Sequence, residues 1–362
     1  MSGELDPAAA IRIVSPFVPE WSAIDPNELT VTQIEGGVIN TVHLIIHRGR
    51  GIIVKQYGGN KFSKEDCANE TAKQSEVLEV LSAHVMSSKG WGPKLLGVYP
   101  GGRIEEYIDS HNLRPDECID PTIRKDIARS FARLHSLKLP LRQQSLASVI
   151  RDMMAYFSCS KTKDTIREYV QSVDHPDAAI VAQQVTDFDH AEELGYVLQQ
   201  LQSRCRESLI ILDCNFNNIL VKHQTDPTDM TVVLIDYEGV MYGFRGVDIG
   251  SHFCNRLVQW LDKGSKLTGL LYPEAEDREA FCEEYRNEMI QLGKELHPEL
   301  DTVEHLMVEG EIGSLFYFCF ESCWLLKYCK NFLQDRPFMS AIRFMHENYT
   351  KAKQRYTQAL HR

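Results

Sequence analysis

The stretch LTVTQIEGGVINTVHLIIHRGRGIIVKQYGG, residues 29–59, decides the fold of the first part of the chain. It holds three runs rich in β-branched residues, at 29–34, 41–47 and 52–56, and the sequences GG and RGRG separate them. Short runs of this kind with glycines between them are typical of antiparallel strands joined by turns. The stretch therefore predicts an antiparallel meander.

The segments that follow extend this sheet. Residues 65–84 have a helical pattern, and PKLLGVY and RIEEYI predict two more strands around the turn PGG at residues 100–102. From about residue 110 onward, apolar residues recur at the spacing of long helices. One hairpin interrupts this helical region.

These patterns predict an α+β protein with two lobes and a cleft between them. We expect a small antiparallel five-stranded N-lobe at residues 28–108 and a larger, mainly helical C-lobe at residues 109–362. Residues 1–27, which are rich in Pro, Ala and Asp, are expected to form an N-terminal arm.

The overall composition excludes some classes of function. The net charge of −12 and the absence of a Lys/Arg block argue against nucleic-acid binding and fit a neutral or cationic small substrate. No apolar run is long enough to span a bilayer, and the N-terminus lacks a signal peptide. The ten cysteines are scattered without a CxxC pair, which favours reduced thiols. We expect a cytoplasmic protein.

The interrupting hairpin follows the polar loop ILDCNFNNIL, residues 211–220. If its strands pair so that Ile219 faces Ile235, Asn218 lies beside Asp236. An amide oxygen and a carboxylate that converge in this way predict a Mg²⁺ site, and Glu238 could bind a second ion. We expect these donors, which are far apart along the chain, to meet in one crevice that binds a nucleotide with its metal.

Asp213 lies five residues before Asn218, on the loop that enters this hairpin. A carboxylate at this place suits a general base that orients a hydroxyl and accepts its proton during phosphoryl transfer. The simpler alternative is a capped polar turn without chemistry.

The N-lobe supplies candidate ATP ligands. Gly36 and Gly37 would let backbone N–H groups approach phosphates, with Asn40 at the rim, although a plain hairpin turn fits these glycines equally well. Lys55 lies within an apolar strand, where its ammonium needs phosphates and a helix glutamate as partners, unless it is an exposed edge residue. The candidate glutamates are Glu76 and Glu79, and the sequence does not choose between them.

With these residues identified, the chain resembles the choline/ethanolamine kinase family, within the protein-kinase-like phosphotransferases. The resemblance begins near Ile34 and rests on GGVIN, GPKLLGVYPGGRIEEYI, ILDCNFNNILV and, above all, LIDYEGVMYGFRGVDIGSHFCN. It implies a kinase-like fold, one or two Mg²⁺ ions, ATP as co-substrate, and γ-phosphate transfer to the hydroxyl of choline. The implied roles are Asp213 as base, Asn218, Asp236 and Glu238 at the metal, and Glu106, Tyr107 and Ile108 around adenine.

The chain departs from the family pattern at several positions. Ile211 and Leu212 precede Asp213 where the family usually has His-Asn, and Lys55 stands where arginine is common. Asn215, assigned to the catalytic and ATP-binding residues, stands where glutamine is common.

The departures at the choline end are larger, because a quaternary ammonium must be held by aromatic faces and nearby negative charge. Trp324 matches an expected cage residue, and Trp260 replaces a tyrosine. Asn255 stands where glutamate is usual, and Glu321 stands where tryptophan is usual. With Asp213, these four residues are the candidate choline-binding set.

The leading hypothesis is a choline kinase that makes phosphocholine, the entry to phosphatidylcholine synthesis by family analogy. One alternative is a kinase of ethanolamine or another amino alcohol, because Asn255 and Glu321 can accept hydrogen bonds from a primary ammonium. A second is a pseudokinase that binds nucleotide without turnover, suggested by Ile211. Phosphorylation of an antibiotic or another small molecule is disfavoured by VDIGSHFCN. The resemblance also implies a homodimer.

Overall fold

The computed structural model describes residues 5–34, 40–57, 70–140, 145–224, 226, 229–261, 264–332 and 337–360. The chain divides into two compact units, which are residues 1–112 with 219–240, and residues 113–218 with 241–362. The hairpin segment 219–240, which the sequence analysis assigned to the C-lobe, therefore groups with the first unit.

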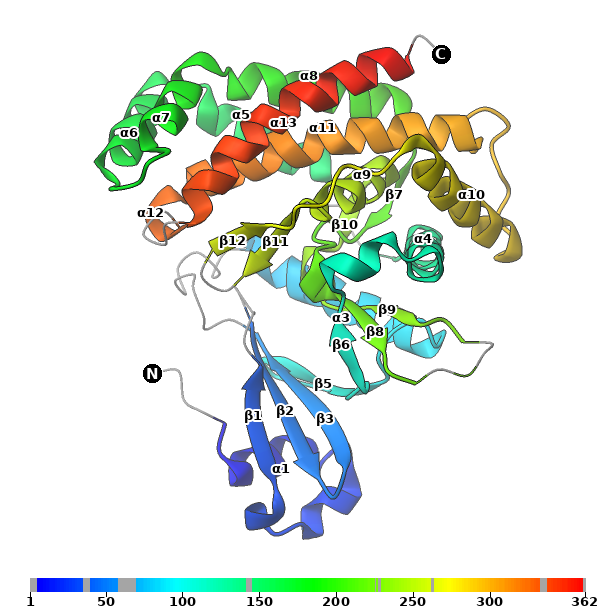
Figure 1. Ribbon diagram of the computed structural model, residues 1–362. Helices are drawn as coiled ribbons and strands as arrows, with labels where there is room; N and C mark the ends of the chain where they lie inside the picture. Colours follow the sequence, from blue (N-terminus) through cyan, green and yellow to red (C-terminus); the bar gives the residue numbers. More distant parts are fainter. Residues whose placement is uncertain are drawn as a thin grey trace. The chain divides into compact units, whose positions relative to one another are not determined.

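The first unit contains the predicted five-stranded antiparallel sheet, with strand order β1-β2-β3-β5-β4 (Figure 1). In β3 the buried side chains of Ile52 and Val54 alternate with the half-buried Ile53, as expected of a strand with one face against a core. The strands are β1 (Thr30–Ile34), β2 (Thr41–His47), β3 (Arg50–Gln56), β4 (Leu95–Tyr99) and β5 (Gly102–Glu106).

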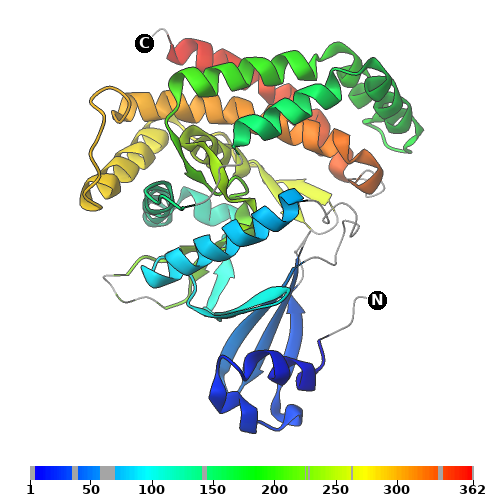
Figure 2. The same cartoon turned by 180° about the vertical axis from the view of Figure 1, so that it is seen from behind.

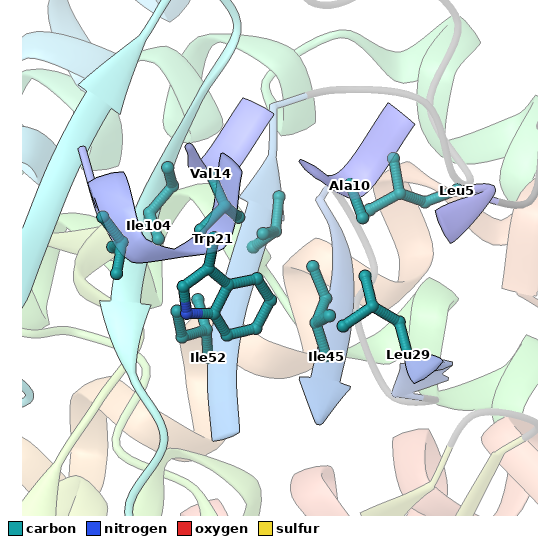
Figure 3. Close-up of a cluster of buried hydrophobic side chains, with 10 residues drawn as sticks. Leu5, Ala10, Val14, Trp21, Leu29, Ile45, Ile52 and Ile104 are labelled. Atoms are coloured by element: carbon teal, nitrogen blue, oxygen red, sulfur yellow. The ribbon is translucent and has the colours of Figure 1, made fainter. Parts of the chain in front are cut away.

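The prediction of an arm at residues 1–27 is wrong for the described part of this segment. Residues 5–28 form α1 (Pro7–Val14), η1 (Pro19–Ala23) and η2 (Pro26–Glu28), each with a proline in its first turn. Their apolar side chains join those of the sheet in one core cluster, in which Val14 and Trp21 are buried together with Ile52 (Figure 3). The segment folds because it buries this apolar surface.

The rest of the first unit completes the scaffold. Helix α3 (Glu70–Ser88) extends beyond the predicted end at residue 84, and residues 65–69 lie outside the described part. A small sheet has the strand order β6-β8-β9, and its strands are β6 (Ser110–Asn112), β8 (Ile219–Lys222) and β9 (Val232–Leu234). The short helix η5 (Tyr237–Gly239) follows β9.

The second unit is mainly helical, as predicted. In Figure 2, α8 in green runs beside α11 in orange, and the two helices are in contact. The helices are η3 (Pro115–Ile119), α4 (Pro121–His135), α5 (Leu146–Phe157), α6 (Ser160–Ser172), α7 (Ala178–Asp187), α8 (His190–Arg204), η4 (Phe216–Asn218), α9 (Arg245–Asn255), α10 (Ala275–Gln291), α11 (Val303–Lys327), α12 (Cys329–Phe332) and α13 (Pro337–Ala359).

Two strand pairs in this unit were not predicted. They are β7 (Glu207–Ile210) with β10 (Met241–Phe244), and β11 (Val258–Leu261) with β12 (Gly264–Leu267). Among the residues that the structure describes, none of the helices combines the length and the apolar character that a membrane crossing needs.

Glycines let α9 and α11 approach each other closely. A Cβ atom on Gly246 of α9 would lie 2.6 Å from the backbone oxygen of Glu309 on α11. A Cβ atom on Gly313 would overlap the backbone oxygen of Gly246. Because these obstacles are backbone atoms, they cannot turn aside as a side chain could. The close crossing fixes the position of both helices.

Replacing Gly313 with alanine should therefore destabilise the protein by at least about 3 kcal/mol, at the upper end of the usual cost of overpacking. Urea unfolding measures this loss directly. The matched control is Gly195→Ala in α8, where the nearest obstacle is the flexible end of Met154 at 3.1 Å. The control should be neutral or slightly stabilising. Equal stability of the two variants would contradict the close crossing.

A buried pair of histidines joins the start of α8 to α13. His190 Nε2 and His346 Nε2 are 3.0 Å apart, so one ring donates and the other accepts. Burial lowers the pKa of His346 to about 4, and burial, followed by the charge of His346, lowers the pKa of His190 well below its ordinary value. Both rings are therefore neutral in the folded protein at neutral pH.

This pair predicts a loss of stability in acid. The unfolded histidines bind protons below their ordinary pKa of about 6.5, whereas the folded ones do not, so stability falls as the pH falls below that value. Between pH 7 and pH 5, the free energy of unfolding should fall by about 2 kcal/mol less in His346→Gln than in the wild type, because glutamine does not titrate. His84→Gln, at an exposed histidine, is the control. An identical pH dependence for His346→Gln and the wild type in urea unfolding would refute this role.

Candidate active site

The first unit holds Lys55 in a network of carboxylates. Lys55 is on β3 and is 4% exposed. Its Nζ donates to Glu79 Oε1 at 2.8 Å, forms an ion pair with Asp236, and lies 3.7 Å from Glu238 Oε2. The structure therefore pairs Lys55 with Glu79, whereas the other candidate, Glu76, is exposed.

The network keeps Lys55 charged. Burial on its own would lower the pKa of Lys55, but the carboxylates of Asp236, Glu79 and Glu238 outweigh burial and raise it above its ordinary value. The side chains of Asp236 and Glu238 remain 27% and 19% exposed, against 5% for Lys55. The lysine is thus a fixed cation with two accessible carboxylates beside it.

Sequence reasoning missed Arg103, which forms the second half of this network. Arg103 on β5 is 1% exposed, forms an ion pair with Glu79, and donates from Nε to Glu105 Oε1 at 2.7 Å. Lys55 and Arg103 are paired across β3 and β5. One carboxylate, that of Glu79, therefore serves two buried cations. The signal in the sequence that could have identified Arg103 is a charged residue within a segment predicted to be a strand.

Asp236 lies at a backbone turn after β9. Its φ of 61° is in the left-handed region, which aspartate tolerates better than most residues. The predicted pairing of Ile219 with Ile235 is wrong, because Ile219 pairs with Leu234. Val221 pairs with Val232, so the register is one residue shorter than expected. Asp236 is consequently two residues beyond the last paired position, and the turn rather than the strand register orients it.

The other ATP-site predictions have mixed outcomes. Asn40 is buried and donates from Nδ2 to Glu238 Oε2 at 2.5 Å, so it contacts the carboxylate network. Gly36 and Gly37 lie outside the described residues.

Of the three residues predicted around adenine, Glu106 ends β5, and Tyr107 and Ile108 come directly after it. The backbone N–H groups of Glu106 and Tyr107 donate to Lys94 and Gly51 at 2.9 and 3.3 Å. These two N–H groups would have to change partners to bind adenine. Ile108 accepts a hydrogen bond from the hydroxyl of Ser110 at its carbonyl oxygen.

The second unit holds Asp213 in a loop of amides. Asn215 Nδ2 donates to Asp213 Oδ1 at 2.6 Å. Asn218 Nδ2 donates to the backbone oxygen of Asp213 at 2.9 Å and to its Oδ2 at 3.3 Å. These contacts orient the carboxylate of Asp213. They also leave Oδ1 of Asn218 as the atom of this side chain that could bind a metal ion.

Asp248, which sequence reasoning did not select, anchors this loop. Its carboxylate is fully buried and accepts from the backbone N–H groups of Ile211 and Leu212 at 2.8 and 2.9 Å. His135 Nε2 lies 3.0 Å from the same carboxylate. Leu212 has a φ of 64°, a conformation that costs a bulky residue about 1–2 kcal/mol. The loop thus keeps a strained backbone in place without the histidine that Ile211 replaces.

The candidate choline-binding residues belong to the same unit. Asn255, at the end of α9, donates from Nδ2 to the backbone oxygen of Cys214 at 2.9 Å. Burial, and then the charge of Asp213, raises the pKa of Glu321 to about 8. Both residues are therefore close to the Asp213 loop.

The two tryptophans have aromatic neighbours. The ring of Trp260 stacks on Phe338 with the centroids 6.3 Å apart and 21° between the planes. Trp324 lies 5.4 Å from the ring of Tyr328. Asn217 Nδ2 donates to the backbone oxygen of Trp260 at 3.3 Å, which ties β11 to the loop that follows Asp213.

An antiparallel five-stranded sheet with a buried Lys–Glu pair, in a chain whose helical unit carries an Asp-x4-Asn loop, defines a protein-kinase-like phosphotransferase. Residues 31–358 match the choline/ethanolamine kinase family, and the chain belongs to this family of kinases with an alcohol acceptor.

Individual relatives agree with this assignment. The chain is 25% identical to a human choline/ethanolamine kinase over 353 residues, which cover 92% of this chain and 80% of the relative. It is 24% identical to a probable ethanolamine kinase A of Dictyostelium discoideum, with 93% and 87% covered. The crystal structure of a choline kinase from Cryptosporidium parvum shares the fold, with a TM-score of 0.70, 18% identity, and coverage of 98% and 97%.

Proposed function

We propose that the protein transfers the γ-phosphate of ATP to the hydroxyl of a small amino alcohol and releases ADP. The observation that carries this proposal is the Asp213 carboxylate, which two amides orient on a loop anchored by Asp248. The sequence prediction names choline as acceptor, with phosphocholine as product, and ethanolamine is the second candidate. A cytoplasmic location, a role in phosphatidylcholine synthesis and a homodimer remain predictions from the sequence.

In this proposal Asp213 accepts the hydroxyl proton while the hydroxyl oxygen bonds to the γ-phosphorus and the bond to ADP breaks. Asn215 holds the Asp213 carboxylate in place. Lys55 is the cation for the phosphates, because Glu79 and its neighbours keep it protonated within the sheet. Asp213 and Lys55 thus have separate roles, because the carboxylate accepts the proton and the ammonium binds the phosphates.

The chain also has donors that fit Mg²⁺, which prefers hard oxygen ligands and uses few of them from protein. Asp236 and Glu238 share Lys55 as a neighbour, and both carboxylates stay partly exposed. We propose that Asp236 and Asn218 bind one ion and that Glu238 contributes to a second. The ion offsets negative charge on the phosphates.

A coupled ADP-release assay tests the proposal. Choline, its partly methylated analogues and ethanolamine are supplied in turn with MgATP, and a reaction without acceptor is the control. ADP release should depend on an amino alcohol. Release that is the same without acceptor would contradict the proposal, and ATP-dependent thermal stabilisation without any release would instead support the pseudokinase alternative.

A further inference from the structure

A buried acceptor on α9 lies close to the catalytic loop. Within the part of the chain that the structure describes, Asn255 Oδ1 is buried and has no hydrogen-bond partner, and the residue is 6% exposed. A buried polar atom without a partner costs free energy, which a ligand that donates to it would recover. The atom therefore marks a place where an N–H or O–H donor is missing.

The orientation of this amide is fixed by its other end. Asn255 Nδ2 donates to the backbone oxygen of Cys214 at 2.9 Å, and a carbonyl oxygen can only accept. The amide oxygen must therefore be the unpartnered end. A glutamate, which the family usually has at this position, could not donate to Cys214. Asn255 therefore has two roles. Its Nδ2 holds Cys214, which lies between Asp213 and Asn215 in the loop, and its Oδ1 presents an acceptor.

A buried carboxyl group on α11, that of Glu321, lies within electrostatic reach of Asp213. Tyr317 and Glu321 are four residues apart on this helix and so share one of its faces. Burial, followed by the charge of Glu321, raises the pKa of Tyr317 well above its ordinary value, and Asp213 contributes in the same direction. The three side chains are therefore electrostatic neighbours. Glycine packing of α9 against α11 holds the helices that carry Asn255 and Glu321 in register.

Resting on the proposed function, we infer that Asn255 and Glu321 determine acceptor specificity and that the site selects an ammonium with N–H groups over a quaternary one. A bound ammonium would favour the ionised form of Glu321, whose carboxylate then supplies the counter-charge, and Asn255 Oδ1 accepts from one ammonium N–H. A trimethylated ammonium has no hydrogen to donate and would leave Asn255 Oδ1 buried and unsatisfied. Sites built to hydrogen-bond a substrate group discriminate strongly against an analogue that lacks it.

The aromatic surface supports the same conclusion. A quaternary ammonium needs open aromatic faces within about 6 Å. Trp260 has Phe338 stacked on one face, so only its other face remains for a cation. Hydrogen-bond acceptors and a carboxylate, rather than aromatic faces alone, are therefore the main recognition elements of this site.

The first test compares kcat/KM for ethanolamine and choline in the wild-type protein, with MgATP at saturation. We expect ethanolamine to be preferred by at least about tenfold, the worth of one hydrogen bond to a charged group. An equal or greater kcat/KM for choline would overturn the inference and leave the proposed function intact. Absence of transfer to every amino alcohol would instead refute the proposed function.

Two variants assign the preference to residues. Asn255→Ala should reduce the ethanolamine-to-choline ratio of kcat/KM by about tenfold, whereas a purely structural effect through Cys214 would lower both substrates equally. Glu321→Gln should raise KM for both substrates by at least about tenfold with a smaller change in kcat. Glu304→Gln, at an exposed glutamate of the same helix, is the matched control and should change neither constant. An unchanged ratio in Asn255→Ala would overturn the role of Asn255, and an unchanged KM in Glu321→Gln would overturn that of Glu321.

Discussion

Replacing Asp213 with asparagine should lower kcat by about 10²–10⁴-fold, the usual contribution of a general base. Asparagine keeps the shape of the side chain and can still accept the hydrogen bond that Asn215 donates. The 3.3 Å bond from Asn218 to Oδ2 is lost, but Asn218 still donates to the backbone oxygen of residue 213 at 2.9 Å, so the loop should keep its conformation. It cannot take the hydroxyl proton at neutral pH. The measurement is a steady-state assay of ADP release with an amino alcohol as acceptor.

ATP binding should survive this change, because the phosphate-binding candidates, such as Lys55, belong to the first unit. Thermal stabilisation by MgATP should therefore be similar in Asp213→Asn and the wild type. Asp229→Asn, at an exposed aspartate in the turn between β8 and β9, is the matched control for the loss of one carboxylate. Full activity of Asp213→Asn would remove the assignment of Asp213 as base.

The second large effect is expected at Asp236. Asp236→Asn should weaken MgATP binding by at least about tenfold and lower kcat, because the variant loses a charged oxygen ligand beside Lys55. Lys55 still has Glu79 at 2.8 Å, so the sheet should remain folded. We expect the Mg²⁺ activation curve of Asp236→Asn to shift to higher Mg²⁺ concentration.

The matched variant for this test is again Asp229→Asn, at an exposed aspartate in the same unit as Asp236. It removes one carboxylate by the same substitution away from Lys55, so it should leave the Mg²⁺ curve unchanged. An Mg²⁺ requirement of Asp236→Asn that equals that of the wild type would show that Asp236 is not a metal ligand.

The five-stranded sheet could be predicted because its first three strands are runs rich in β-branched residues, and glycine-containing turns mark the ends of its strands. The pairing of β7 with β10 could not, because about thirty residues separate Ile210 from Met241 and neither short strand has a partner nearby. The N-terminal segment was misjudged for a similar reason. Its polar and proline content predicts an arm, while its few apolar residues, such as Trp21, are buried against the sheet.

The candidate site likewise contains residues that the sequence identifies and residues that it does not. Asp213 and Lys55 stand out in the sequence, because each places a charged group in an unexpected local context. The choice of Glu79 over Glu76 depends on the rotation of α3 about its axis, which a weakly amphipathic sequence does not specify. Asp248 contacts the backbone of Ile211 and Leu212, and Arg103 forms an ion pair with Glu79; a local pattern does not reveal such contacts between residues distant in sequence.

The most direct test of the central claim is phosphorus NMR of the wild-type protein with MgATP and ethanolamine. The account predicts loss of the γ-phosphate signal and stoichiometric growth of a phosphomonoester signal coupled to the neighbouring methylene protons, together with ADP. Formation of inorganic phosphate alone, or an unchanged ATP spectrum while ATP still stabilises the fold, would contradict phosphoryl transfer to an amino alcohol.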